Sequence, residues 1–117
     1  MSTNSQIAFT PLGKTIVVAA AGTAPTGVQA PVSEKFNPQN AGQYRFVNAG
    51  TNTVFLGTGP TAALAQAAAV APTAGSPSDA IVLVPGAVEI LRSGIDTFFS
   101  GLASGATTVY VTPGQGL

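Results

Sequence analysis

The carboxylates of the C-terminal half are the first candidates for chemistry in this sequence. Asp79, Glu89 and Asp96 are the acidic residues of that half, and neighbouring carboxylates can bind Ca²⁺ or act as a general acid and base. Their spacing matches no EF-hand loop, and Asp79 stands just before a predicted strand, where aspartate commonly serves a turn. We therefore expect no catalytic residue and no metal ligand among them.

Two residue types that often serve in catalytic and zinc sites are missing from the sequence. The 117-residue chain contains no cysteine and no histidine. This composition removes the commonest zinc ligands, the usual general base near neutral pH and the usual partner of a serine or cysteine nucleophile. We expect a protein that is not an enzyme and that binds no cofactor or metal.

One glycine-containing segment invites comparison with phosphate-binding loops. Gly57-Thr58-Gly59-Pro60 precedes an alanine-rich run, but it lacks both the Gly-Lys-Ser/Thr ending of the P-loop and the third glycine of the dinucleotide fingerprint. Pro60 also removes a backbone donor. A helix start is the better interpretation, with Gly59 at the cap and Pro60 in the first turn.

The alanine-rich run predicts one short helix over residues 60–70. Alanine and leucine favour helix. Because so short a helix is marginal by itself, Leu64 and the alanines are expected to rest on a sheet. The alternative is a flexible low-complexity loop, since Pro72, Gly75 and Pro77 follow the run.

Two arginines and most aromatic residues fall on predicted strands. Arg45 and Arg92 are expected to pair with Glu89 or another acid, or to lie at an interface. Six aromatic side chains are expected in the core rather than on a sugar-stacking platform, and the chain has no tryptophan to favour a lectin. These six are Tyr44, Phe46, Phe55, Phe98, Phe99 and Tyr110.

The charge content excludes one class of partner and favours another. Four Lys and Arg and four Asp and Glu give a net charge of zero and 7% charged residues, where about 25% is ordinary. Four scattered cations cannot form a nucleic-acid-binding patch. Because low net charge promotes association, we expect part of the surface to be covered by another protein or by copies of the chain.

The N-terminus and the apolar runs bear on location. The first residues, Met-Ser-Thr-Asn-Ser-Gln-Ile, show no basic region followed by an apolar one, so no signal peptide is expected. No apolar run approaches the roughly 20 residues needed to span a bilayer. We expect synthesis in the cytoplasm and no membrane partner.

The clearest strand pattern lies at residues 43–57, which we interpret as a β-hairpin. Side chains alternate over 43–47 as they do when successive residues point to opposite faces of a sheet. Two asparagines and a glycine in 48–52 supply a turn, and 53–56 return as the second strand. Because a two-stranded ribbon is marginal in water, the hairpin needs a second sheet or a partner to cover it.

Further strands are expected on both sides of this hairpin. Residues 13–21 are rich in β-branched residues without alternation, which predicts a strand covered on both faces. A short edge strand is expected at 7–10, ended by Pro11. The C-terminal third predicts strands at 80–84, at 87–92 as partner or successor of the first, at 97–100 and at 107–112, ending at Pro113.

The spacing of strands and turns predicts a mainly β fold, an antiparallel β-sandwich or jelly roll with one short helix or loop. We expect residues 1–11 to form an N-terminal arm and 12–117 to form a single domain. A proline-punctuated loop is expected at 22–38, with a short extended piece at 28–32. A loop of that length usually makes contacts, so the arm and the loop are the expected contacting parts.

From residue 43 onward the sequence resembles small virion proteins of tailed phages, typically head decoration or cement proteins. The resemblance rests on four segments of turn and strand residues: Val47–Asn52, Val54–Gly57, Pro85–Glu89 and Val109–Gly116. It assigns no individual residue to a functional site. Residues 1–38 take no part in it.

The resemblance implies a structural protein of the virion that binds the outer head surface and bridges capsomers. Its implied partners are the major capsid protein and copies of itself, most simply in a homotrimer, after synthesis in the host cytoplasm. Two alternatives stay open at this point. One is a surface binding module, such as a head fibre or a glycan-binding decoration, and the other is a structural protein of the tail or neck.

Overall fold

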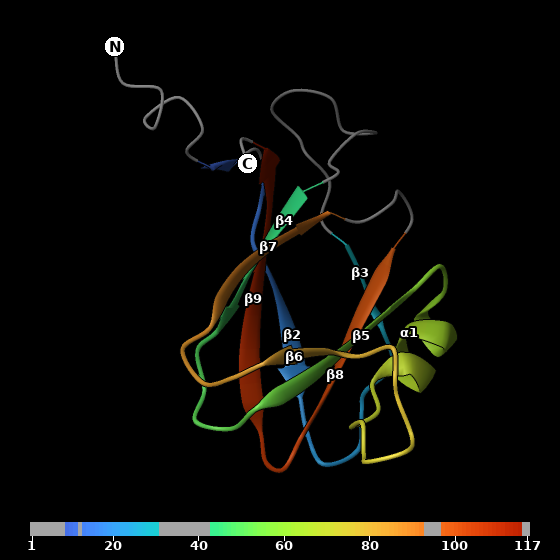
Figure 1. The fold of residues 1–117 in the computed structure, drawn as a ribbon. Coiled ribbons are helices and arrows are strands. Elements are labelled where there is room, and N and C mark those ends of the chain that lie inside the picture. The colour runs from blue at the N-terminus through green and yellow to red at the C-terminus, as the bar shows by residue number, and fades with distance from the viewer. Residues whose placement is uncertain (1–8, 12, 31–42, 93–96, 116–117) are drawn as a thin grey trace.

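The fold is mainly β, and two antiparallel sheets pack face to face as a β-sandwich with one short helix beside them (Figure 1). The computed structural model describes residues 9–11, 13–30, 43–92 and 97–115. The five-stranded sheet contains β1 (Thr10–Pro11), β2 (Ile16–Ala20), β4 (Gln43–Asn48), β7 (Val88–Arg92) and β9 (Thr107–Gln115). The four-stranded sheet contains β3 (Val28–Gln29), β5 (Val54–Gly59), β6 (Ile81–Leu83) and β8 (Phe98–Ala103), and the helix α1 is Ala62–Ala68. The predicted fold class is therefore confirmed.

Strand β9 organises the five-stranded sheet. It pairs with β1 and β2 along one side and with β4 along the other, and β7 pairs with the far side of β4. β9 was predicted to end before Pro113, but it continues to Gln115, because β1 and the start of β4 pair with its last residues. Pro11, predicted to end the first strand, lies within β1. Residues 7–8 of that predicted strand lie outside the described residues.

The predicted hairpin at 43–57 is wrong. Its two strands exist, but β4 lies in the five-stranded sheet and β5 in the four-stranded sheet, so the chain crosses between the sheets. Phe46 on β4 and Leu56 on β5 are both buried in the space between the sheets. An alternating pattern predicts a strand with one buried face, but two such faces can lie side by side in one sheet or opposite each other across a core.

A buried asparagine fixes this crossing. The Asn48 side-chain oxygen accepts the Gly50 N–H at 3.0 Å, which reverses the chain, and its amide donates to the carbonyls of Asn52 and Leu83, each at 2.9 Å. The main chain of Asn48 also bonds to Gly86 and Ala87, each at 3.0 Å. Asn48 therefore ties its own loop to the β6–β7 turn, and β7 is the successor of β6 in the opposite sheet.

Strand β2 was predicted to be covered on both faces, and this is also wrong. Val18 and Ala20 are buried, whereas Val17 beside Val18 is 49% exposed and Ala19 between the two buried residues is also exposed. The strand therefore alternates between buried and exposed positions. The sequence does not reveal this alternation, because the exposed positions carry apolar side chains as well. In the predicted loop at 22–38, β3 is the extended piece, and residues 31–38 lie outside the described residues.

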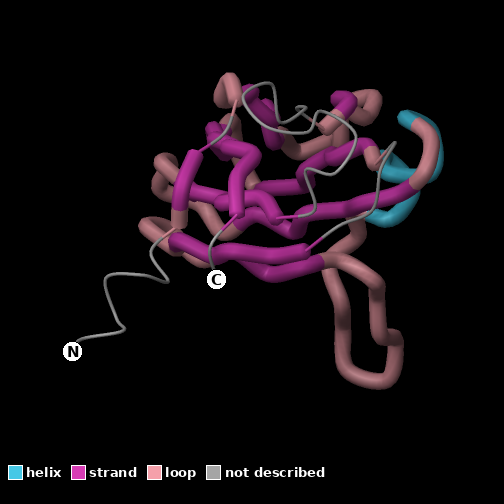
Figure 2. Tube along the Cα trace, turned by 90° about the horizontal axis from the view of Figure 1, so that it is seen from above, coloured by secondary structure: helices cyan, strands magenta, loops and turns pink. Residues whose placement is uncertain are grey.

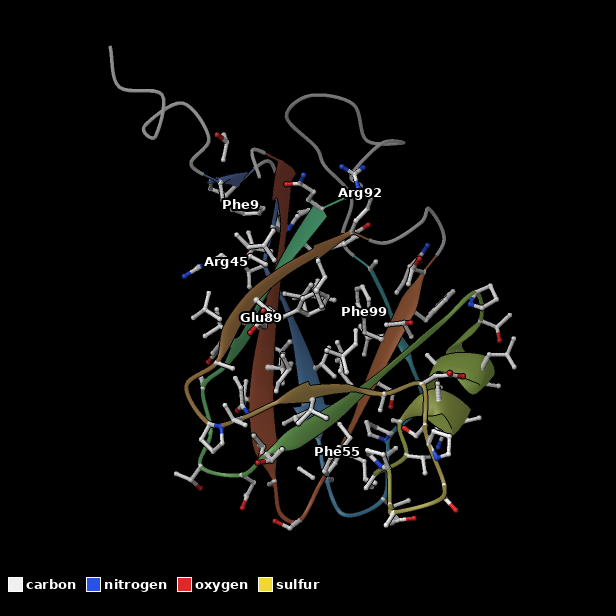
Figure 3. All side chains as sticks on the ribbon, in the orientation of Figure 1. Phe9, Arg45, Phe55, Glu89, Arg92 and Phe99 are labelled. Carbon is white, nitrogen blue, oxygen red and sulfur yellow. The ribbon has the colours of Figure 1, made fainter. Side chains whose placement is uncertain are left out.

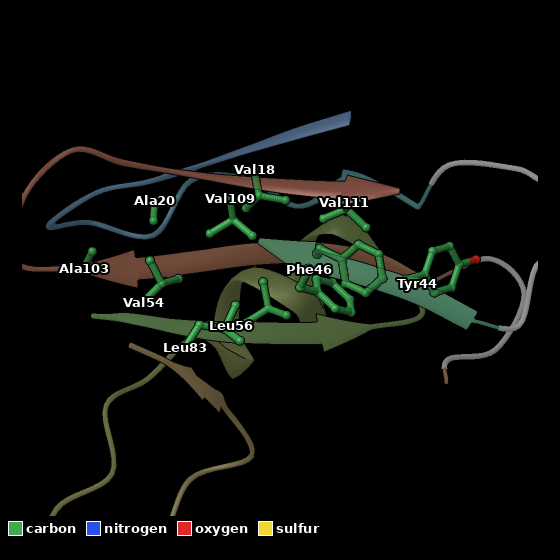
Figure 4. Close-up of a cluster of buried hydrophobic side chains, with 11 residues drawn as sticks. Val18, Ala20, Tyr44, Phe46, Val54, Leu56, Leu83, Ala103, Val109 and Val111 are labelled. Atoms are coloured by element: carbon green, nitrogen blue, oxygen red, sulfur yellow. The ribbon is translucent and has the colours of Figure 1, made fainter. Parts of the chain in front are cut away.

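The core lies between the two sheets (Figure 4). Phe99 packs edge-on against Tyr44 and Phe46, with ring centroids 5.5 and 5.2 Å apart. The members of the core cluster are Val18, Ala20, Tyr44, Phe46, Val54, Leu56, Leu83, Phe99, Ala103, Val109 and Val111. Of the six aromatic residues expected in the core, Phe55 and Phe98 are half-buried and Tyr110 is exposed.

The alanine-rich run is a helix, although it begins and packs differently from the prediction. Thr61, rather than Gly59, is the N-cap, because its hydroxyl oxygen accepts the Leu64 N–H at 3.2 Å. The helix covers the outer face of the four-stranded sheet with its small residues. Ala65 and Ala69 are buried there, whereas more than half of Leu64 is exposed.

Candidate functional site

The predicted acidic candidates do not come together. Asp79 is exposed in the loop after α1, and this loop projects from the body in Figure 2. Asp79 lines a pocket of about 240 Å³. Glu89 lies on β7 of the other sheet, and Asp96 lies outside the described residues. Across the described ranges, no three His, Cys, Asp or Glu residues are grouped as metal ligands would be.

The segment 57–60 has a packing role that the sequence reasoning missed. A Cβ atom added to Gly57 would meet the backbone of Ala65 and Ala69 at 2.4 Å, and one added to Gly59 would meet the Ala65 nitrogen at 2.9 Å. Both glycines lie in β5, where they let the helix backbone rest directly on the strand. The signal for this role was two alternate glycines in a strand followed by an alanine-rich helix.

The two arginines do not pair with Glu89. Arg45 stands opposite Ile90, and Glu89 stands opposite Phe46. Because successive residues of a strand point to opposite faces, Arg45 and Glu89 project from opposite faces of the sheet. Arg92 falls on the same face as Arg45, opposite Gln43. Asp79 and Glu89 are the only acids in the part of the chain that the structure describes, and Glu34 and Asp96 lie outside it.

An apolar row crosses the outer face of the five-stranded sheet. The register places Val17 of β2 opposite Tyr110 of β9, Tyr110 opposite Val47 of β4, and Val47 opposite Val88 of β7. Val17, Tyr110 and Val88 are 49%, 42% and 48% exposed. We call these four residues the outer row. With strands about 4.8 Å apart, the outer row is about 14 Å long.

A polar rim borders the outer row on the side of β1. The hydroxyls of Thr15 and Thr112 bond to each other at 2.8 Å, and Thr112 stands opposite Arg45. Phe9 and Pro11 complete a pocket of about 370 Å³ with these three residues. We call it the Arg45 pocket. In Figure 3 the Arg45 side chain projects away from the strands on the side where Phe9 lies.

The outer face of the four-stranded sheet is arranged differently. Helix α1 lies over the end of β5 that carries Gly57 and Gly59. Beyond the helix, Phe55 stands between Val82 and Leu102, of which Val82 is 48% exposed. Among the described residues, no helix or strand lies over the outer row in the same way (Figure 1).

The outer row was absent from the sequence-based expectations, although its central member could have been found. Val109 and Val111 are buried on one face of β9, so Tyr110 between them must face outward.

The comparison of the chain with protein families, curated proteins and solved structures finds no match. No helix within the described ranges is long and apolar enough to cross a membrane.

Proposed function

We propose that this protein is a structural component of a virion, which binds the outer surface of a capsid through the outer face of its five-stranded sheet and bridges neighbouring capsomers. The outer row carries this proposal. Specific interfaces commonly place apolar and aromatic residues at the centre and polar residues at the rim. The outer row with the Arg45 pocket beside it has this arrangement. The resemblance of the sequence to head decoration proteins supplies the identity of the partner.

The size of the face sets the expected strength of each contact. Five residues of a strand extend about 17 Å, so a face of about 14 by 17 Å is small beside the roughly 800 Å² per partner of a standard interface. One copy should therefore bind modestly. Many copies that bridge subunit boundaries add association energy at every boundary, which is how weak contacts stabilise a whole particle.

The outer row must be distinguished from other exposed apolar residues. Purified heads that lack the protein are mixed with the chain, and occupancy is measured by quantitative gel analysis. The double variant Val17→Lys, Val88→Lys should reduce occupancy at least tenfold, because it places two charges in the row. The matched control is Val82→Lys, Val84→Lys, whose residues are similarly exposed on the four-stranded sheet side. Failure of the intact chain to bind heads, or equal losses in both variants, would contradict the proposal.

Copies of the chain are the second proposed partner, and a homotrimer is the expected form. The support is the neutral net charge together with exposed apolar residues outside the outer row, namely Leu64 on α1 and Val70 just after the helix. Sedimentation equilibrium of the intact chain and both double variants separates loss of self-association from loss of docking. A clean monomer at about 10–50 μM, where specific oligomers normally persist, would count against self-association.

A glycan-binding decoration is the second candidate function, and the exposure of Tyr110 favours it. Sugar sites often stack the ring of an aromatic residue against a pyranose and surround it with hydrogen-bonding groups. The cross-strand neighbours of Tyr110 are instead Val17 and Val47. We therefore rank capsid docking first, and a glycan array with Tyr110→Ser as control tests the other candidate.

A further inference from the structure

We propose that the Arg45 pocket binds a carboxylate, supplied by an acidic side chain of the protein on which the outer face docks. The identity of that partner rests on the function proposed above. The pocket has three parts: the guanidinium of Arg45, the linked hydroxyls of Thr15 and Thr112, and the apolar wall of Phe9 and Pro11.

Among the described residues, no acidic side chain stands next to Arg45 in the sheet. Arg45 is exposed on β4, and its cross-strand neighbours Ile90 and Thr112 carry no charge. Within the described ranges the two acids lie elsewhere, Glu89 on the opposite face of the sheet and Asp79 in the loop after α1. The guanidinium is always protonated and offers five N–H donors.

Docking of a partner on the outer row would affect the charge of Arg45. Arg45 and Val47 are two residues apart on the same face of β4, which is about 7 Å along a strand. A partner that covers the outer row therefore also covers Arg45 or its immediate surroundings. Removing an arginine from water without a counter-charge carries a large desolvation penalty. A partner that fits this face must supply an anion at the pocket.

The groups that line the Arg45 pocket favour a carboxylate over other anions. One cation neutralises one negative charge, which favours a carboxylate over a phosphate dianion. A carboxylate can accept two parallel N–H bonds from a guanidinium. Within the Thr15–Thr112 pair one hydroxyl donates to the other, so one hydroxyl hydrogen stays available for a carboxylate oxygen. The pocket volume of about 370 Å³ leaves room for an acidic side chain beside Phe9.

Arg92 provides a matched comparison within the same sheet. It lies on the same outer face as Arg45, at the end of β7, and it is also exposed. Its pocket is smaller, at about 160 Å³, and is lined by Gln43, Ile90 and Leu91, with no hydroxyl pair and no aromatic wall. A response at Arg45 that is missing at Arg92 therefore reports the pocket and not merely a positive charge.

The test uses the isolated full chain and sodium propionate as the probe. Nuclear magnetic resonance follows the Nε–H signals of both arginines and the amide of Thr112, with propionamide and sodium chloride at equal ionic strength as controls. We expect saturable shifts at Arg45 and Thr112 with propionate alone. Binding should weaken at least tenfold in Arg45→Gln and change less than twofold in Arg92→Gln. Equal shifts at Arg92, or equal shifts with chloride, would overturn the pocket.

A second arm measures occupancy on heads and keeps this inference apart from the proposed function. Arg45→Gln should lower occupancy about tenfold, and Arg92→Gln less than twofold. If intact protein occupies heads and Arg45→Gln does so equally well, the inference fails and the proposed function stands. If propionate binds but the intact chain does not occupy heads, the carboxylate site stands and its assignment to a capsid partner fails. Tenfold tighter binding of glucuronate than of propionate would overturn the protein partner in favour of an acidic sugar.

Discussion

The outer faces of the two sheets differ in how much of their apolar surface the chain itself covers. On the four-stranded sheet, Gly57 and Gly59 take the place of side chains, and a helix of alanines lies directly on the strand. On the five-stranded sheet, the corresponding outward positions carry Val17, Tyr110 and Val88, which stay about half exposed. The part of the first face that carries Gly57 and Gly59 is covered by the chain itself. The second has the composition of a covered face, which is why we propose that a partner covers it.

The difference teaches how to separate structural from functional apolar residues in a chain with so few charges. Where the chain closes a face, its residues are shaped to the neighbour that closes it, as Gly57 is shaped to the backbone of Ala65. Where a face is open to another molecule, its side chains are large and aligned across neighbouring strands, and no described helix or strand packs against them.

The largest effect is expected where the chain closes its own face. Gly57→Ala should lower the free energy of unfolding by about 3 kcal/mol, because the new methyl group would meet backbone atoms of α1 that cannot turn aside. Gly22→Ala, whose new methyl group would come no closer than 4.0 Å to its nearest neighbour, is the control and should change stability by less than about 0.5 kcal/mol. Urea denaturation at fixed protein concentration measures both. Equal stability of the two variants would contradict the close helix packing.

Adjacent residues of β2 test the contrast within one strand. Val18→Thr should cost about 2 kcal/mol, because it buries a hydroxyl among apolar side chains, whereas Val17→Thr should cost less than about 0.5 kcal/mol. The substitution is the same and only the face differs. Similar losses in urea denaturation would mean that both faces of β2 are covered.

A smaller effect is expected at the cap of the covering helix. Thr61→Ala removes the hydroxyl oxygen that accepts the Leu64 N–H and should lower the free energy of unfolding by about 1 kcal/mol. Thr61→Ser keeps the acceptor and should behave nearly as the wild type. If Thr61→Ala also leaves the stability unchanged, the helix contributes little to closing its face.

The pH dependence of stability provides a test inside the core. Burial raises the pKa of Tyr44 above its ordinary value of 10.0. Because the neutral phenol is favoured in the folded chain, this contribution is complete below the unfolded pKa and is lost as pH rises above 10 through the folded pKa. Tyr44→Phe should therefore show a shallower loss of stability in alkaline solution. Identical alkaline profiles for the wild type and Tyr44→Phe would contradict this.

The sequence predicts strands well in this protein and predicts their partners poorly. The alternation around Tyr44 and Phe46 locates β4, because only one side of a sheet faces the core. The same alternation does not indicate whether β5 lies beside β4 in one sheet or opposite it across the core. That choice is made by the Asn48 side chain, whose partners include Leu83, 35 residues away. The sequence does not distinguish an asparagine that forms a turn from a buried asparagine that holds a crossing between two sheets.

The candidate site was harder to predict than the fold, for a related reason. Reactive side chains can be recognised in a sequence by their type, whereas the outer row consists of valines and a tyrosine that only the sheet aligns. Val17 and Val88 are 71 positions apart and become parts of one row only through β9 and β4. Arg45 was singled out from the sequence, but its freedom from Glu89 depends on the register of β7.

The central place of β9 has a consequence for how the protein acquires its structure. During synthesis β9 emerges from the ribosome after all the other described strands, yet β1, β2 and β4 all need it as their neighbour. No two described strands joined by a short turn pair with each other, so local hairpins cannot form first and folding should be slow. The strands with valine and phenylalanine faces must wait unpaired, exposed to aggregation. Yield in the cell should therefore depend on chaperones and temperature more strongly than the stability of the finished sandwich would suggest.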